Sequence, residues 1–140
     1  MENSFQVLLY YIYTPLMNPQ ALRDSQRELC EKLSLKGRII IAEEGINGTV
    51  EGTQENTQKY MKAMHKTSYF KDLYFKKSPG TGKAFSKLSV KVRSEVVRLG
   101  IPEVNPTKIK GKYLSSEKLH AWFEEGREFY IIDMRNDYEY

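Results

Sequence analysis

The run at residues 5–13, FQVLLYYIY, is apolar at both odd and even positions. That pattern predicts a strand inside a sheet, covered on at least one face and paired on both edges. Asn18 and Pro19 follow as an N-cap and first-turn pair, and leucines then recur near helical spacing among charged residues. We therefore expect an interior strand followed by an amphipathic helix over residues 19–35.

A β-hairpin is expected next along the chain. The β-branched run at residues 38–42 predicts a strand. The residues from Glu43 to Gly48 then supply turn residues, and the Asn47–Gly48 pair is typical of a tight turn. A second strand is predicted to begin at Thr49.

The remaining elements of the first domain are a helix and two extended segments. Thr53 can cap a helix that reaches about His65. Its apolar face is formed by Thr57, Tyr60, Met61 and Met64. Residues 72–76 and 87–93 read as strands around a glycine-rich loop. The order β-α-β-β-α-β predicts an α+β, ferredoxin-like fold over residues 4–98, with a small antiparallel sheet backed by two helices.

The last third of the chain reads differently. Residues 99–114 contain two prolines and little periodicity, which predicts a linker. Ser115 can cap a third helix that ends at Gly126, and residues 129–133 read as a buried strand. We expect a ferredoxin-like domain at 1–98, the linker at 99–114, and a helix with the truncated start of another domain at 115–140.

Positive charge is concentrated in the middle of the chain. The net charge is only +4, but residues 56–112 hold 14 of the 22 lysines and arginines and 3 of the 18 acidic residues. Such a block attracts a polyanion, because binding releases counterions that are condensed on the polyanion. Nucleic acid is therefore the leading class of partner, and a solvated lysine-rich face is the alternative.

The segment at residues 78–83, SPGTGK, lies inside this basic block. A phosphate-binding loop of the NTPase type would need glycine where this chain has Lys77, and Ser or Thr where it has Ala84. We read the segment instead as a flexible basic loop beside an RNA backbone. Phe75 and Phe85 could stack on unpaired bases, although each taken alone is better read as a core residue. The candidate RNA-binding residues are Lys76, Lys77, Lys83, Lys87, Lys91 and Arg93.

The strand predicted at residues 87–93 has one apolar and one basic face. The first is formed by Leu88, Val90 and Val92, and the second by Lys87, Ser89, Lys91 and Arg93. A positive sheet face suits RNA, but this strand lacks the aromatic residues with which an RRM stacks bases. We therefore expect binding through phosphates and shape rather than sequence reading.

The single cysteine, Cys30, cannot form an internal disulfide, which points to the cytoplasm as the compartment. It lies next to Leu29 on the first predicted helix, so we read it as a packed core residue rather than a nucleophile. His65 and His120 have no partners at metal-ligand spacing, and we expect no metal site. No apolar run is long enough to cross a bilayer, so a membrane partner is not expected.

Three stretches resemble the rhodanese-containing tRNA uridine(34) hydroxylases, formerly an uncharacterised protein family. Residues 37–50 resemble that family's amino-terminal domain and include the motif Glu43, Glu44, Gly45, Ile46, Asn47 and Gly48. Residues 91–97 with Leu99 and Gly100 resemble the same domain. Residues 130–140 resemble the opening strand and D-x-R-x-x-x-E element of a rhodanese domain, through Asp133, Arg135 and Glu139.

This resemblance implies an oxidoreductase that uses molecular oxygen as co-substrate to hydroxylate the wobble uridine of tRNA at carbon 5. It also implies an acylphosphatase-like amino-terminal domain, in agreement with the element order above. Acylphosphatase activity itself is not expected, because residues 13–16 after the first strand contain no arginine. The family's catalytic cysteine belongs to the rhodanese domain and is expected beyond Tyr140. We therefore expect neither a catalytic residue nor a cofactor in this chain.

Three hypotheses follow for the function of the chain. The first is a tRNA-binding and positioning part of such a hydroxylase, which holds the anticodon arm. The second is a rhodanese-type sulfurtransferase or sulfur carrier whose amino-terminal domain binds a protein partner. The third is a small regulatory ligand-binding domain, because ferredoxin-like folds host many functions. The sequence leaves the oligomeric state open.

Overall fold

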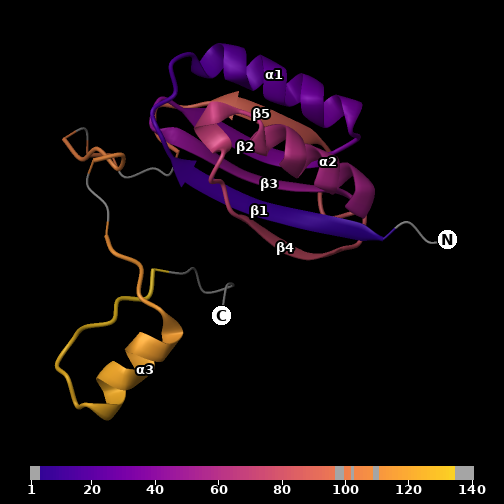
Figure 1. Ribbon diagram of the computed structural model, residues 1–140. Helices are drawn as coiled ribbons and strands as arrows, with labels where there is room; N and C mark the ends of the chain where they lie inside the picture. Colours follow the sequence, from indigo (N-terminus) through magenta and orange to yellow (C-terminus); the bar gives the residue numbers. More distant parts are fainter. Residues whose placement is uncertain (1–3, 97–99, 102, 109–110, 135–140) are drawn as a thin grey trace. The chain divides into compact units, whose positions relative to one another are not determined.

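The computed structural model describes residues 4–96, 100–101, 103–108 and 111–134, and the chain divides into two compact units, Met1–Ile109 and Lys110–Tyr140. The first unit is a five-stranded sheet with two helices over one of its faces (Figure 1). Its elements are β1 (Phe5–Tyr13), α1 (Pro19–Lys32), β2 (Lys36–Ala42), β3 (Gly45–Thr53), α2 (Gln54–His65), a 3₁₀ turn (Ser68–Phe70), β4 (Phe75–Gly80) and β5 (Leu88–Val92).

The strands lie in the order β4-β1-β3-β2-β5. All neighbours are antiparallel except β2 and β5, which are parallel. The predicted ferredoxin-like fold is confirmed, and β1 is the interior strand that its apolar pattern indicates. The prediction of an antiparallel sheet is wrong for one pair. After β4 at one edge the chain crosses to the opposite edge, where β5 runs alongside β2 in the same direction.

Both helices begin where the sequence predicts. The Asn18 side chain accepts a hydrogen bond from the Ala21 amide at 3.1 Å, and the Thr53 hydroxyl accepts one from the Asn56 amide at 3.2 Å. Each cap satisfies an amide that the first turn leaves without a partner. Helix α1 packs on β2 and β5, and α2 packs on β1 and β3. In the described part of the chain, no helix has the length and apolar character needed to span a membrane.

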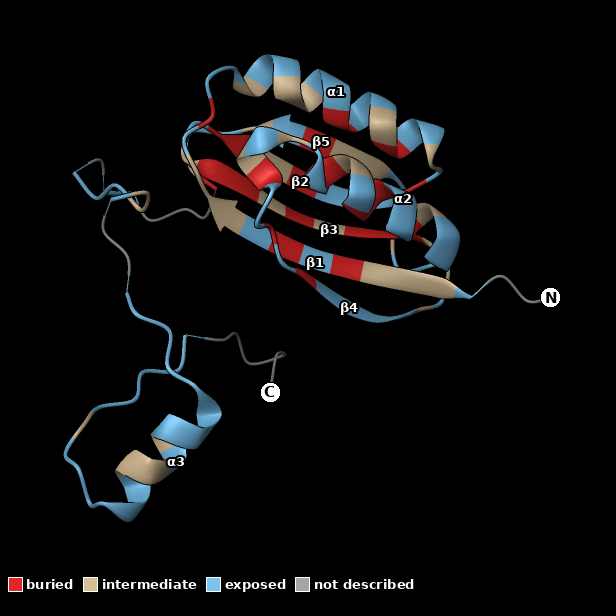
Figure 2. Cartoon of the chain, viewed as in Figure 1, coloured by how far each residue is buried: buried red, intermediate tan, exposed pale blue. Residues whose placement is uncertain are grey.

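The core lies between the helices and the sheet, where Figure 2 colours the residues as buried. The strands contribute Leu8, Tyr10, Ile39, Ile41, Ile46, Val50 and Val90, and the helices contribute Cys30, Tyr60, Met61 and Met64. A short polar chain crosses this core: the Tyr10 and Tyr60 hydroxyls are hydrogen-bonded, and the Tyr60 hydroxyl donates to Gln26 Oε1 at 2.7 Å. The Gln26 amide in turn contacts Met64 Sδ at 2.9 Å. Buried polar groups are thus paired within the core.

The hairpin between β2 and β3 is tighter than predicted. Its turn consists of Glu43 and Glu44 alone, and Gly45 already pairs with Ala42. The prediction of a turn at Asn47 and Gly48 is therefore wrong, because both lie inside β3. Residue 48 is a glycine because the Tyr10 ring occupies the position where a side chain would stand, and not because the chain turns there.

Strand β4 lies three residues later than the predicted strand at 72–76. Leu73 is buried after the 3₁₀ turn, and its amide donates to the Phe70 carbonyl at 3.1 Å. The strand then includes Ser78, Pro79 and Gly80, where the sequence predicts a loop. A proline is tolerated because β4 is an edge strand, where one row of amides pairs with no neighbour.

The second unit contains α3 (Ser116–Glu124), capped by the Ser115 hydroxyl as predicted. Phe129 packs against Trp122 and Phe123, with ring centroids 5.5 and 5.0 Å apart. The strand predicted at residues 129–133 is not formed. A strand requires a neighbour for its backbone groups, and none of the described residues pairs with this segment.

Candidate nucleic-acid interface

The six candidate RNA-binding residues do not form one patch. Lys76 and Lys77 lie on edge strand β4, whereas Lys91 lies on β5 at the other edge, with Lys87 and Arg93 beside its ends. Four strand spacings separate the two edges, roughly 19 Å. Lys83 lies in the connection that joins them. The basic residues therefore lie along both edges of the sheet and across one of its ends.

The connection that carries Lys83 is anchored by Glu51, the residue of β3 that pairs with Val7. Glu51 Oε1 accepts hydrogen bonds from the Thr81 and Gly82 amides, both at 2.8 Å, and Oε2 accepts one from the Ala84 amide at 2.9 Å. This residue is only 4% exposed. The loop is thus fixed to the sheet by its backbone, while the Lys83 side chain remains exposed.

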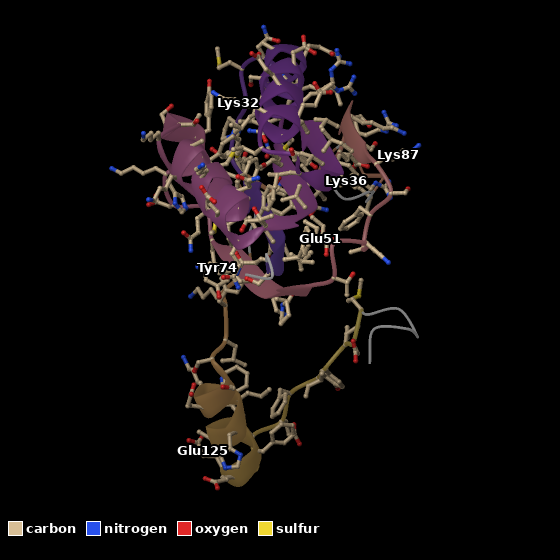
Figure 3. All side chains as sticks on the ribbon, turned by 90° about the vertical axis from the view of Figure 1, so that its right-hand side faces the viewer. Lys32, Lys36, Glu51, Tyr74, Lys87 and Glu125 are labelled. Atoms are coloured by element: carbon tan, nitrogen blue, oxygen red, sulfur yellow. The ribbon has the colours of Figure 1, made fainter. Side chains whose placement is uncertain are left out.

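The same anchored end of the sheet carries two further lysines. Figure 3 shows Lys36 and Lys87 near one another, with Glu51 in the same part of the sheet. The Gly37 amide donates to the Lys87 carbonyl at 3.1 Å, which holds the loop against the first residues of β2. Lys36 and Lys87 are both exposed, so their charges face solvent.

The two phenylalanines considered for base stacking are placed differently. Phe75 is buried between the rings of Tyr10 and His65, with centroid distances of 5.0 and 5.4 Å. It is a core residue and is not placed to stack on RNA. Phe85 is half-buried in the connection after Lys83.

The motif from Glu43 to Gly48 shapes the end of the sheet. The carbonyls of Glu44 and Glu43 accept hydrogen bonds from the Thr14 and Leu16 amides, both at 2.9 Å. These bonds hold the segment after β1 against the hairpin turn. The Glu44 carboxylate also accepts a bond from the Val96 amide at 2.7 Å.

The rest of the motif serves packing on the sheet. Gly45 has φ 155°, and a side chain there would overlap the Ile12 carbonyl. Ile46 is fully buried in the core, and Asn47 lies opposite Tyr11. These motif residues therefore position the sheet rather than present a reactive group.

The remaining candidates for chemistry are limited. Cys30 is fully buried, and burial raises the pKa of its thiol to about 12, with nearby Glu31 adding to the effect. Such a thiol is protonated at neutral pH and is not a nucleophile. No group of three or more His, Cys, Asp and Glu side chains is placed to hold a metal ion among the residues that the structure describes. Asp133 lies in an irregular segment, and Arg135 and Glu139 are outside the described residues.

Sequence reasoning missed a second surface, on the sheet face opposite the helices. Leu8 and Tyr10 point into the core, so alternation along β1 turns Leu9 and Tyr11 to the other face. Leu9 is 49% exposed and Tyr11 is 54% exposed. Arg38 is exposed between the buried residues of β2. The apolar run of β1 gave no signal of which face would stay open, because both of its faces are apolar.

Comparison with known proteins identifies relatives across the chain. A profile described as the UPF0176 acylphosphatase like domain matches residues 5–96. A tRNA uridine(34) hydroxylase of Bacillus cytotoxicus is 43% identical over 141 residues, which covers 100% of this chain and 43% of the relative. A tRNA uridine(34) hydroxylase of Enterococcus faecalis is 48% identical over 138 residues, with 97% and 43% coverage. The chain thus spans less than half the length of these curated relatives.

One solved structure supports the fold. BlrB, a BLUF protein in its dark state, superimposes with a TM-score of 0.54 and 15% sequence identity. The match covers 69% of this chain and 78% of that chain. At this identity the likeness concerns the arrangement of helices and strands alone.

Proposed function

The chain belongs to the UPF0176 acylphosphatase-like domain family, and on that basis we propose that it is the tRNA-binding and positioning part of a cytoplasmic, oxygen-dependent tRNA uridine(34) hydroxylase. The resemblance to the tRNA uridine(34) hydroxylases is confirmed, and the rhodanese element at residues 130–140 stays a prediction. One observation carries the proposal: relatives that bear the name tRNA uridine(34) hydroxylase align with 97–100% of this chain. We assign the oxidation itself, with molecular oxygen as co-substrate, to the longer protein.

The proposed role of this chain is to hold the anticodon arm. Lysines and arginines on both sheet edges and on the connection between them suit the phosphates of a folded RNA. Such contacts fix the position and orientation of a nucleic acid without reading its sequence. Each phosphate that they neutralise releases a counterion, so their contribution to the affinity should weaken as the salt concentration rises.

The test is binding of the 140-residue chain to a wobble-uridine tRNA, measured by fluorescence anisotropy at two salt concentrations. The test variant changes Lys76, Lys77, Lys83, Lys87 and Lys91 to Ala. A matched control variant removes the same charge from the helices and the turn after α2, by changing Lys32, Lys59, Lys62, Lys66 and Lys71 to Ala. Circular dichroism establishes that both variants are folded.

We expect tRNA binding that weakens with salt, that the test variant loses, and that the control variant largely keeps. The slope of log K against log salt should also become shallower in the test variant, by roughly 0.7–0.9 for each phosphate that is no longer neutralised. Equal losses of tRNA affinity in both variants would show that binding depends on the net charge of the chain and not on the positions of the lysines. Absence of binding at low salt by the folded wild-type chain would overturn the proposal.

A further inference from the structure

Within the first unit, the described helices leave one face of the sheet uncovered. Helices α1 and α2 both lie over the opposite face (Figure 1). We call the uncovered side the open face and define it by Leu9 and Tyr11 of β1 and their cross-strand neighbours. It lies between the basic residues of β4 and β5 described above.

Two adjacent rows of side chains cross the open face. In the first, Lys76 of β4 is opposite Leu9, Leu9 is opposite Thr49, and Thr49 is opposite Arg38. In the second, Tyr11 is opposite Asn47, Asn47 is opposite Ile40, and Ile40 neighbours Lys91 of β5. Rows on one face are about 7 Å apart along the strands, and strands are about 4.8 Å apart. Each row therefore combines apolar or aromatic surface with a cation at its edge.

The aromatic part of the open face is ordered by its own packing. The rings of Tyr11 and Tyr13 meet edge to face, with centroids 6.3 Å apart and planes at 72°. Just over half of the Tyr11 surface is nevertheless exposed. An exposed ring held in a fixed orientation offers a flat surface to a planar ligand.

The charge of the open face favours a polyanion. Arg38, Lys76 and Lys91 are exposed on it. Among the strand residues, all of which the structure describes, Glu51 is the only carboxylate. Glu51 is nearly inaccessible and is engaged by three backbone amides. No strand carboxylate therefore repels a phosphate group approaching this face.

We propose that the open face binds unpaired RNA nucleotides, with a base stacked on Tyr11 and phosphates held by Arg38, Lys76 and Lys91. The inference rests on the proposed function and deepens it, since it names single-stranded RNA as the ligand of a particular surface. Stacking on Tyr11 requires an exposed base face, and inside a duplex both faces of each base are covered by the neighbouring base pairs. The aromatic group that strand β5 lacks is supplied by β1. The open face thus adds base contacts to binding otherwise expected through phosphates and shape.

The experiment compares a fluorescently labelled seven-nucleotide uridine-rich RNA with a duplex RNA of the same length, each titrated with the 140-residue chain. The variants are Tyr11→Ala and Tyr11→Phe. Tyr130→Ala is the matched control, because Tyr130 is an exposed tyrosine of the second unit and lies outside the strands. We expect Tyr11→Ala to weaken single-strand binding about 5- to 150-fold, the usual range when the aromatic partner of one stacked base is removed. Tyr11→Phe and Tyr130→Ala should bind as the wild type does.

Photocrosslinking provides a readout that does not depend on how a variant folds. RNA with 5-iodouridine, irradiated in complex with the wild-type chain, should crosslink within the β1 peptide at Tyr11. Retained binding by Tyr11→Ala, or crosslinks confined to other peptides, would overturn the inference while leaving the tRNA-binding proposal intact. If the wild-type chain bound no RNA at all, the proposed function itself would be overturned. Protection of Tyr11 by a protein domain without RNA would also contradict the inference.

Discussion

The ring of Tyr10 on β1 lies over the backbone of Gly48 on β3, in the space that a side chain at residue 48 would occupy. The ring is held from its other sides as well. Its hydroxyl bonds to Tyr60, and its ring packs against Phe75 with centroids 5.0 Å apart. Tyr10 is only 2% exposed and is held by these three neighbours, so the absence of a side chain at Gly48 is a packing requirement.

We predict that Gly48→Ala lowers the free energy of unfolding by about 1–3 kcal/mol, because the added methyl group overlaps a fixed ring. Urea denaturation measures the change. Gly111→Ala is the control, since a methyl group there meets no atom within 4 Å. That control should stay within about 0.5 kcal/mol of the wild type. Equal stability of the Gly48 variant and the wild type would contradict the packing interpretation.

The prediction of a turn at Asn47–Gly48 was wrong because the local sequence does not decide between a turn and a strand at these two residues. The same dipeptide suits a tight turn and a strand position beneath an aromatic ring. Only the pairing of β1 with β3 decides between them, and that pairing joins residues far apart in the chain. Strand β1 and helices α1 and α2 were predictable, because their apolar periodicity and caps are local properties.

The candidate interface shows the same division between local and distant information. The concentration of lysines in residues 56–112 was visible in the sequence. Their division between two edges depends on β5 crossing to the far side of the sheet, which no local pattern indicates. The exposure of Tyr11 was hidden for a further reason, since both faces of β1 are apolar and the helices select one of them.

We predict that Glu51→Gln loosens the connection between β4 and β5. Glutamine keeps one acceptor oxygen, but its amide group would face the Ala84 amide, donor against donor. The expected cost is about 1–3 kcal/mol, with faster hydrogen exchange at Ala84 than in the wild type. Exchange measured by NMR at each amide provides the check.

The control for this prediction is Glu55→Gln, which removes an exposed ion pair with Lys59. Exposed pairs of this kind contribute little, so its stability should change by less than about 0.5 kcal/mol. An unchanged exchange rate at Ala84 in the Glu51 variant would show that the loop is held by other interactions.

We predict that stability falls at alkaline pH, in part through Cys30. Burial raises the pKa of the thiol from 9.0 to about 12. Above pH 9 the unfolded chain releases this proton while the folded chain keeps it, so rising pH favours unfolding. Between pH 8 and pH 10 the thiol should account for a loss of about 1.4 kcal/mol. Burial also raises the pKa of Tyr10 and of Tyr60, which extends the decline above pH 10.

Urea denaturation at pH 8 and pH 10 tests the contribution of the thiol. Cys30→Ala is less stable at both pH values because it leaves a small cavity, but it should lose about 1.4 kcal/mol less than the wild type on going from pH 8 to pH 10. Equal losses in the two proteins would show that the thiol does not titrate differently in the folded state.

The hydroxyls of Tyr10 and Tyr60 should contribute unequally to stability. The Tyr60 proton is donated to Gln26, so the hydrogen bond between the two tyrosines must use the Tyr10 proton. Tyr10→Phe then removes the proton donated to the Tyr60 oxygen. The Tyr60 hydroxyl still donates to Gln26, so only a lone pair of its oxygen loses a partner, at a cost of about 1 kcal/mol. Tyr60→Phe leaves both the Tyr10 hydroxyl and the Gln26 oxygen buried without that partner.

We therefore expect Tyr60→Phe to cost at least twice as much as Tyr10→Phe, because about 1–3 kcal/mol is lost for each buried polar group left unpaired. A double-mutant cycle by urea denaturation should give a coupling energy of about 0.5–3 kcal/mol between the two hydroxyls. The double variant should lie close in stability to Tyr60→Phe, since removing the Tyr10 hydroxyl then also removes an unpaired group. A Tyr10→Phe variant as unstable as Tyr60→Phe would reverse the assigned direction of the hydrogen bond, with Tyr60 donating to Tyr10 instead of to Gln26.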